Sequence, residues 1–439
     1  MMSKQINRRA VLASTGCLLS LVVFINGSLV SAKLQRPAVA PRTSRSAAVI
    51  AATESVLKET SELRELSVLR DVKSGALSRT DIERNLIKNL DEDSTPAELH
   101  AAEVYLKALG LAPKEFDYRP FLIKLLAEQV AGYYDPKVQQ FYLADWIELE
   151  GQKPVMAHEL THALQDQHFN LRRFEKWPKG DSDAELAAHA LIEGDATLAM
   201  TVYLTKYPLV ALAFVRSMGA TDAASEQFKL APRALRESLL FPYAQGSAWA
   251  TQVFRRGGWK NVSDAFSKLP QSTEQILHVD KYFAYEAPVK LTIPDLNGAL
   301  GPMWKRLEAD VNGEWGLYLC LDEFLKDEEE SKRAAAGWGG DRFALYENGK
   351  TGEVFIVQYT AWDTENDASE FFAAYAKRID KRYLNAKALS ENASADRLEW
   401  ETNAGKVLLE RRGQRVMILE GIPPAVKVDT LVHAAWPVN

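Results

Sequence analysis

Cysteine is almost absent from this chain of 439 residues, which contains only Cys17 and Cys320. Cys17 lies in an uncharged N-terminal stretch that we expect to be cleaved off or to remain in a membrane. Only Cys320 is then left for the folded part, which excludes an intrachain disulfide there. The fold must therefore be stabilised by packing and by any metal that it binds.

The chain also lacks an excess of basic side chains. It has 53 lysine and arginine residues against 59 aspartate and glutamate residues, a formal net charge of -6, and no concentrated basic stripe. We expect no nucleic-acid partner, because nucleic-acid-binding domains need clustered positive charge. Beyond the first 32 residues there is no long apolar run, so no further membrane span is predicted.

The N-terminus has the composition of an export segment. Basic residues precede a stretch, residues 10–32, that carries no charge and ends in Val-Ser-Ala. We predict that residues 1–32 are a signal peptide or, without cleavage, a membrane anchor, and that residues 33–46 are a flexible linker. The protein is thus expected to be exported and to act in the periplasm or outside the cell.

Histidine is scarce as well, and four of the seven residues lie between positions 158 and 189. Two belong to the sequence His158-Glu159-Leu160-Thr161-His162, an HExxH motif. Side chains four positions apart share a helix face, so both imidazoles can bind one zinc ion with Glu159 beside its open position. Glu159 can then take a proton from the water that zinc activates. The alternative, a chance occurrence in an ordinary helix, would bury a glutamate between two imidazoles at a considerable cost.

A catalytic zinc ion needs a third protein ligand, and the sequence offers two candidates. His168 has the spacing of HExxHxxGxxH, but Gln165 replaces the glycine that lets the chain leave the helix. If the helix continues, His168 lies about 9 Å beyond His162 along the axis and off the shared face. Glu193 follows in an alanine-rich segment that favours a second, closely packed helix, although an exposed carboxylate is the usual role of a glutamate. We therefore predict that His158, His162 and Glu193 bind Zn²⁺.

The segments HELTHALQDQHF and ALIEGDAT together resemble the gluzincin division of the zincin metallopeptidases. In that group the third ligand is a glutamate on a downstream helix, often followed by glycine, as Glu193 is followed by Gly194. A closer resemblance is to uncharacterised secreted bacterial HExxH proteins, for which EQVAGYYDPKVQQFYLAD, STEQILHVDKY and GWGGDRFALYE are typical segments. This resemblance runs from about Glu128 to Tyr346 and implies a zincin-like fold and zinc chemistry, but no substrate.

Polar residues close to these ligands are candidates for orienting them. His189 is one helical turn before Glu193, and Asp166 or Asp195 could bind the free ring nitrogen of a ligating histidine. The alternative for all three is a solvated polar stripe on a helix surface.

Residues on both sides of the motif could contact a substrate. Residues 132–143 are predicted to form a hairpin around an Asp-Pro turn, and residues 138–143 could be an edge strand to which an extended peptide adds. Tyr243 and His278 are candidates to stabilise a tetrahedral oxyanion, although both residue types more often serve packing.

The chain divides into three regions after the linker, and the predicted fold class is α+β. Residues 47–120 have helical periodicity and form a helical lead-in, and residues 121–338 form a mostly helical, zincin-like core with a small edge sheet. Residues 339–439 form a C-terminal α+β domain. In that domain we expect strands at 343–346, 354–359, 407–410 and 416–419 and a helix at 367–382.

The sequence therefore predicts an exported zinc metallopeptidase that acts on peptide or protein substrates, with Glu159 as general base. Two alternatives remain. The protein could bind peptides or assist assembly through a zinc site without proteolysis, although an intact Glu159 argues against this. It could also hydrolyse a bond other than a peptide bond, because zinc, water and a base are chemically general.

Overall fold

The computed structural model describes residues 42–129, 131–146, 149–177, 180–219 and 226–436. The predicted export segment and the first part of the predicted linker lie outside the described residues. Helix α1 begins at Arg42, within the stretch that was expected to be a linker. Among the described residues, no single helix is long and apolar enough to cross a membrane, and one pair, α6 with α7, passes that test only together, with a bend of 113° between them.

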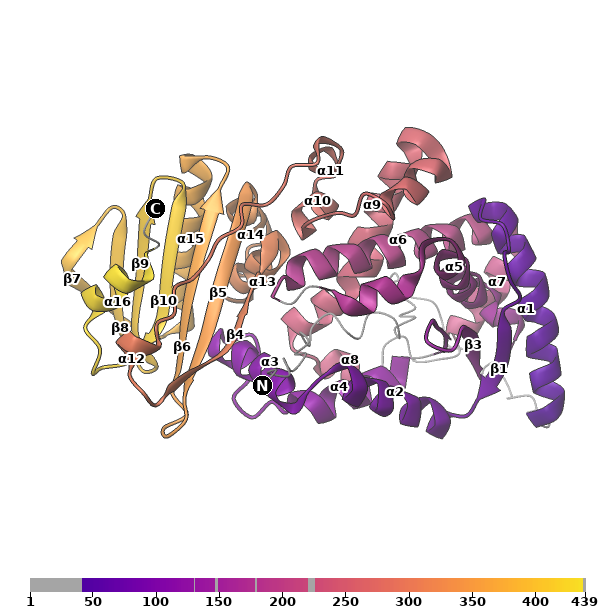
Figure 1. Cartoon of the computed structure of the whole chain (residues 1–439), viewed down its shortest axis with the longest axis horizontal. Coiled ribbons are helices and arrows are strands. Elements are labelled where there is room, and N and C mark those ends of the chain that lie inside the picture. The colour runs from indigo at the N-terminus through magenta and orange to yellow at the C-terminus, as the bar shows by residue number, and fades with distance from the viewer. Residues whose placement is uncertain (1–41, 130, 147–148, 178–179, 220–225, 437–439) are drawn as a thin grey trace, which may run out of the picture.

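A helical part and a seven-stranded sheet lie side by side along the long axis of the molecule (Figure 1). This arrangement confirms the predicted α+β class. The helices of the first part are α1 (Arg42–Arg64), α2 (Arg79–Asp93), α3 (Pro96–Ala108), α4 (Tyr118–Gln129), α5 (Lys153–Phe169), α6 (Ser182–Lys206), α7 (Pro208–Gly219), α8 (Glu226–Leu230), α9 (Arg233–Ala265), α10 (Thr273–Leu277) and α11 (Val279–Ala284), with the short 3-10 helices η1 (Glu150–Gln152) and η2 (Leu171–Lys176).

A small sheet lies within the helical part and combines segments that are distant in sequence. Its strands are β1 (Lys73–Leu77), β2 (Gly132–Asp135) and β3 (Gln140–Ala144), in the order β1-β3-β2. The predicted hairpin is present as the antiparallel pair β2–β3. The prediction that residues 138–143 form an edge strand is wrong. Strand β3 is the central strand, because it pairs with β2 on one side and in parallel with β1 on the other. The outer strands among those described are β1 and β2.

The large sheet is antiparallel throughout, with the strand order β4-β5-β6-β10-β9-β8-β7. All four expected strands and the expected helix are present. Strands β4, β7 and β8 were not expected, and β4 precedes the boundary proposed at residue 339. The strands are β4 (Trp304–Asp310), β5 (Trp338–Asn348), β6 (Val354–Trp362), β7 (Lys387–Ser394), β8 (Arg397–Thr402), β9 (Gly405–Arg412) and β10 (Arg415–Ile422); the helices are α12 (Asn297–Leu300), α13 (Gly313–Leu325), α14 (Glu328–Ala335), α15 (Glu365–Arg382) and α16 (Val428–Ala435).

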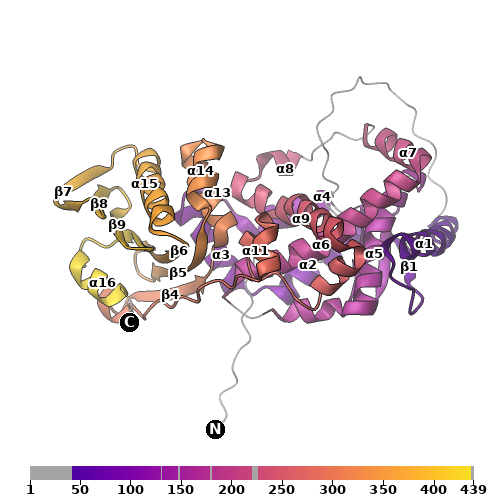
Figure 2. The same ribbon diagram turned by 90° about the horizontal axis from the view of Figure 1, so that it is seen from above.

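Helices cover both faces of this sheet, as the view from above shows (Figure 2). Strand β6 is buried at almost every position, which explains why apolar residues occupy both of its faces. Its two polar side chains, Gln358 and Thr360, are also buried and have hydrogen-bond partners. On one face, Leu345 and Ile418 belong to a single hydrophobic core that extends into α6 and α9, whereas α12 and α16 close the opposite face with a smaller core. The sheet and the helical part are therefore packed against each other through a continuous core.

Candidate metal centre

Helix α5 carries the HExxH motif through the interior of the helical part. Pro154 is in the first turn of α5, as the sequence predicted. A backbone N–H at that position has no partner within the helix, so its absence in proline costs no hydrogen bond. Residues 154–166 are all buried, so polar side chains within this stretch need partners inside the protein. Helix α6 packs along α5 and supplies the second set of polar side chains.

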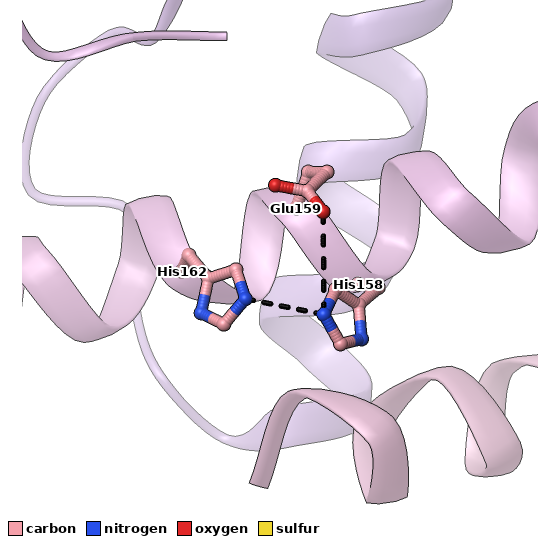
Figure 3. Close-up of side chains that lie close together, drawn as sticks. All are labelled: His158, Glu159 and His162. Carbon is pink, nitrogen blue, oxygen red and sulfur yellow. Dashed lines mark hydrogen bonds and ion pairs between the residues drawn. The ribbon is translucent and has the colours of Figure 1, made fainter. Parts of the chain in front are cut away.

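Three ring and carboxylate atoms converge between these two helices. His158 Nε2 and His162 Nε2 are 3.1 Å apart (Figure 3), and Glu193 Oε2 on α6 lies 3.1 Å from the first and 3.3 Å from the second. The structure thus brings together the three residues that were predicted to bind zinc. All three are buried, and so is Glu159 beside them.

The size of this triangle fits a tetrahedral metal ion. Zinc binds histidine nitrogen and carboxylate oxygen at about 2.0–2.2 Å, so neighbouring ligand atoms at the tetrahedral angle are about 3.3 Å apart. The observed separations of 3.1, 3.1 and 3.3 Å are close to that value. Two imidazole nitrogens and one carboxylate oxygen meet here, which is the donor set of a His₂Glu zinc site.

Glu193 and His162 shift each other's pKa values. Burial opposes ionisation of both side chains, but the attraction between their opposite charges dominates. Burial raises the pKa of Glu193, yet the charge of His162 and the hydrogen bonds from both histidines lower it to about 2. Burial likewise lowers the pKa of His162, yet the negative charge and hydrogen bond of Glu193 raise it to about 9. The two groups therefore form a buried ion pair.

Glu159 is held by one oxygen and leaves the other available. The backbone N–H of Tyr134, on β2, donates a 2.8 Å hydrogen bond to Glu159 Oε2. Glu159 Oε1 lies 4.0 Å from His158 Nε2 and has no hydrogen-bond partner among the described residues (Figure 3). Burial raises the pKa of Glu159, although the two histidines lower it in part. Its orientation thus depends on the outer strand β2.

His162 is oriented by a chain of buried hydrogen bonds. Asp195, one of the predicted orienting residues, acts in it through Gln165, which sequence reasoning missed. Gln165 Nε2 donates to Asp195 Oδ2 at 2.9 Å and to the carbonyl of Ile192 at 3.0 Å, so its Oε1 must accept from His162 Nδ1, 2.9 Å away. This bond leaves Nε2 of the ring directed at the cluster. Gln165 occupies the position of the metzincin glycine, and its spacing of three from His162 was the signal that could have revealed it.

Asp195 is in turn fixed by a buried arginine from α1. Arg64 Nε donates to Asp195 Oδ1 at 2.5 Å and Arg64 Nη2 to Oδ2 at 3.1 Å, and both side chains are fully buried. The Arg64 guanidinium also lies over the ring of Trp259, 4.5 Å from its centroid. The lead-in helix α1 therefore supports the cluster through Asp195 and Gln165.

Two glycines let α9 approach α6 beside the cluster. A Cβ atom on Gly194 would lie 2.2 Å from the carbonyl oxygen of Gly246, and one on Gly246 would lie 2.3 Å from that of Ala190. Such contacts are far too short, so both positions require glycine. The crossing brings Tyr243, one turn before Gly246, to the ring of His158, with a centroid distance of 6.1 Å and an interplanar angle of 26°.

His278, the other predicted oxyanion candidate, belongs to a different group of charges. Its Nε2 lies 2.9 Å from Glu314 Oε1 on α13, and this hydrogen bond raises the pKa of His278. Nearby, Lys281 Nζ donates to Glu274 at 2.6 Å, as well as to Glu286 and Asp363. Lys281 thus bridges the three carboxylates of this acidic cluster.

The remaining polar candidates, His168, Asp166 and His189, have separate surroundings. Helix α5 continues to Phe169, and His168 Nε2 bonds to the carbonyl of Ser67 at 2.8 Å, away from the cluster. Asp166 accepts hydrogen bonds from Arg70 and from the hydroxyl of Tyr134, at 2.8 and 2.9 Å, so it fixes β2. Burial lowers the pKa of His189 to about 4, which keeps this side chain neutral at pH 7.

Comparison with known proteins concerns the sheet alone. A family model described as a domain of unknown function, DUF8575, matches residues 302–432. This segment begins just before β4 and ends within α16, so it contains the whole seven-stranded sheet and none of the cluster residues. No curated protein and no solved structure matches the chain.

Proposed function

We propose that this protein is a zinc-dependent hydrolase, most specifically a peptidase of the gluzincin type, that uses His158, His162 and Glu193 as metal ligands. The observation that carries the proposal is the convergence of Nε2, Nε2 and Oε2 of these residues within 3.1–3.3 Å, at the spacing of a tetrahedral site. A zinc ion bound there would supply a Lewis acid that polarises a carbonyl group and makes water acidic.

Glu159 is the proton carrier in this proposal. Its Oε2 is fixed by Tyr134 N–H, so Oε1 is the atom that takes a proton from the attacking water and later gives it to the leaving nitrogen. Tyr243 is the better placed of the two oxyanion candidates, because its ring lies against His158, whereas His278 pairs with Glu314. The presence of Glu159 beside the three proposed ligands favours hydrolysis over simple binding.

Strand β2 gives the proposed site a place for an extended substrate. It is an outer strand of the small sheet, and the bond from Tyr134 N–H to Glu159 places it next to the cluster. That N–H is occupied, so a substrate would pair with the other backbone groups of β2. A peptide can pair with such an outer strand through backbone hydrogen bonds. We also propose that the protein is exported, on the basis of the uncharged stretch at residues 10–32.

The test is cleavage of an unstructured protein, such as casein, by the parent chain and by Glu159→Gln at equal zinc occupancy. General acid–base catalysis contributes about 10²–10⁴ in rate, so Glu159→Gln should lose that factor in kcat/KM while it retains the metal. A chelator should abolish cleavage and added zinc should restore it. Equal cleavage by both chains would exclude Glu159 as the base. If neither cleaves, a binding role or a non-peptide substrate replaces the proposal.

A further inference from the structure

Helix α7 exposes a row of large apolar side chains to solvent. Leu209 is 82% exposed, Val215 59% and Leu212 47%. Spacings of three place these residues on one side of the helix. Single exposed apolar side chains are common on protein surfaces, but a group of them on one helix face is typical of a surface that binds a partner or a membrane.

The opposite side of α7 is fixed to the helical part. Val210 packs against the hydrophobic core that α1, α5 and the small sheet share. Next to it, the helix rests on η1, where a Cβ atom on Gly151 would lie 2.8 Å from the Ser217 Cβ and 3.6 Å from the Ala213 carbonyl oxygen. The helix therefore has a defined orientation, and its three exposed apolar side chains point away from the protein.

The charged side chains of this segment are all basic. Between Asp195 and Asp222 the sequence contains no acidic residue, and its only charged residues are Lys206 and Arg216. Both are exposed, and neither forms an ion pair with a described residue. Arg216 follows Leu209 by seven positions, two helical turns, so it lies on the exposed side of α7. The apolar row is thus accompanied by positive charge, which complements an anionic surface.

Acidic residues near α7 come from neighbouring elements. Glu150 of η1 forms a 2.9 Å ion pair with Lys153. Burial and the charges of Glu59 and Glu62, on α1, raise the pKa of Tyr207, the residue just before α7. None of these acids is part of α7, so the charge of the helix itself is positive.

The position of α7 also agrees with the predicted export segment. Helices α1 and α7 lie at the same end of the molecule in both views (Figures 1 and 2). Helix α1 begins at Arg42, and residues 33–41 can span at most about 30 Å. If residues 10–32 stay in a membrane as an anchor, this end of the molecule is therefore held close to that membrane.

We propose that α7 binds to the surface of a membrane that contains anionic lipids, with Leu209, Leu212 and Val215 inserted between the headgroups. Short amphipathic helices with an apolar face and basic side chains bind membranes in this way. Arg216 can bury its aliphatic stem beside the apolar row and extend its guanidinium to a lipid phosphate. The helix lies on the membrane and does not cross it, because α6, which precedes it, is largely buried in the core. The inference is independent of the zinc chemistry.

A fluorescent label on α7 tests the proposal in the full chain. The variant Leu212→Cys, made together with Cys17→Ser, offers one accessible thiol, because Cys320 is buried. A nitrobenzoxadiazole dye on that thiol should shift its emission to the blue when vesicles of phosphatidylcholine and phosphatidylglycerol are added, and less so with phosphatidylcholine alone. The same dye at Lys350→Cys, in the exposed turn between β5 and β6, is the control and should not respond.

The two label positions separate insertion of α7 from other modes of binding. If residues 10–32 alone bind the vesicles, the dye at position 212 remains in water, and its unchanged emission would overturn the proposal. An equal response at positions 212 and 350 would do the same, because it indicates general adsorption. A blue shift without vesicles that grows with protein concentration would assign the apolar row to a second copy of the chain instead.

Substitutions in the labelled chain measure the contribution of single residues. Leu209→Asp should weaken vesicle binding about ten-fold or more, whereas Leu384→Asp, which changes a leucine that is 91% exposed between α15 and β7, should leave it unchanged. Arg216→Gln should weaken binding to the anionic vesicles about five-fold and have no effect with phosphatidylcholine alone. Equal lipid affinities of Leu209→Asp and Leu384→Asp would refute the membrane role of α7.

Discussion

Two glycines, Gly194 and Gly246, allow α6 and α9 to cross closely, so a larger side chain at either position should force the helices apart. In Gly246→Ala the new Cβ would lie 2.3 Å from the carbonyl oxygen of Ala190, whereas ordinary contacts begin at 3.4 Å. The distance from the new Cβ to this oxygen is thus about 1.1 Å too short, and the oxygen belongs to a helix backbone that cannot rotate away. The helices must therefore separate by about 1 Å, which would also displace Glu193 and Tyr243.

The expected cost follows from the size of this clash. Overpacking a core usually costs about 1–3 kcal/mol, and replacing a helical glycine by alanine returns about 0.8–1 kcal/mol through helix propensity. We expect a net loss of about 1–2 kcal/mol in the free energy of unfolding, because the size of the clash places the cost in the upper part of that range. Gly298→Ala is the matched control, because no atom lies within 4 Å of its added Cβ and it is also in a helix.

Urea unfolding monitored by tryptophan fluorescence measures this difference, and zinc content reports on Glu193 in the same samples. Gly246→Ala should unfold at a lower urea concentration and bind zinc more weakly than the parent, and Gly298→Ala should match the parent or exceed it slightly. If Gly246→Ala unfolds at the same urea concentration as Gly298→Ala, the two helices do not approach each other as closely as described.

Three further predictions concern the surroundings of the cluster. Gln165→Ala should lower zinc affinity about 10–100-fold, because the ring of His162 loses its orienting partner. The control Gln167→Ala removes hydrogen bonds to the backbone of a neighbouring loop and should leave zinc affinity unchanged. Equal zinc dissociation constants in the two variants would contradict the orienting role of Gln165. Arg64→Met should lower the free energy of unfolding by about 3–5 kcal/mol, because Asp195 is left buried and charged without its partner; an unchanged urea midpoint would show that this ion pair contributes nothing. Tyr243→Phe should reduce kcat for peptide cleavage at unchanged zinc content, and full activity of that variant would remove Tyr243 from the site.

The sequence predicted the parts of the site that depend on local periodicity. His158 and His162 are separated by one helical turn, so their common face follows from the spacing once α5 is recognised as a helix. The alanine-rich segment around Glu193 correctly indicated a second closely packed helix. Strand β6 was also predicted locally, because β-branched and aromatic residues favour strands.

Features that depend on distant pairing were not predictable in this way. Strand β1 has the sequence KSGAL, which contains neither an apolar run nor alternation, and it exists because it pairs with β3 across more than sixty positions of the chain. That pairing also makes β3 central instead of an outer strand. The bond between Arg64 and Asp195 joins residues 131 positions apart, and no local pattern marks it.

The zinc content of the purified chain tests the central claim most directly. Metal analysis after dialysis against zinc should give one ion per chain for the parent and for Glu185→Ala, which makes the same change on the same helix two turns from the cluster. Glu193→Ala should lose most of the zinc, because only two of the three protein ligands remain. One zinc ion per chain in Glu193→Ala, with an affinity equal to that of the parent, would contradict the proposed centre.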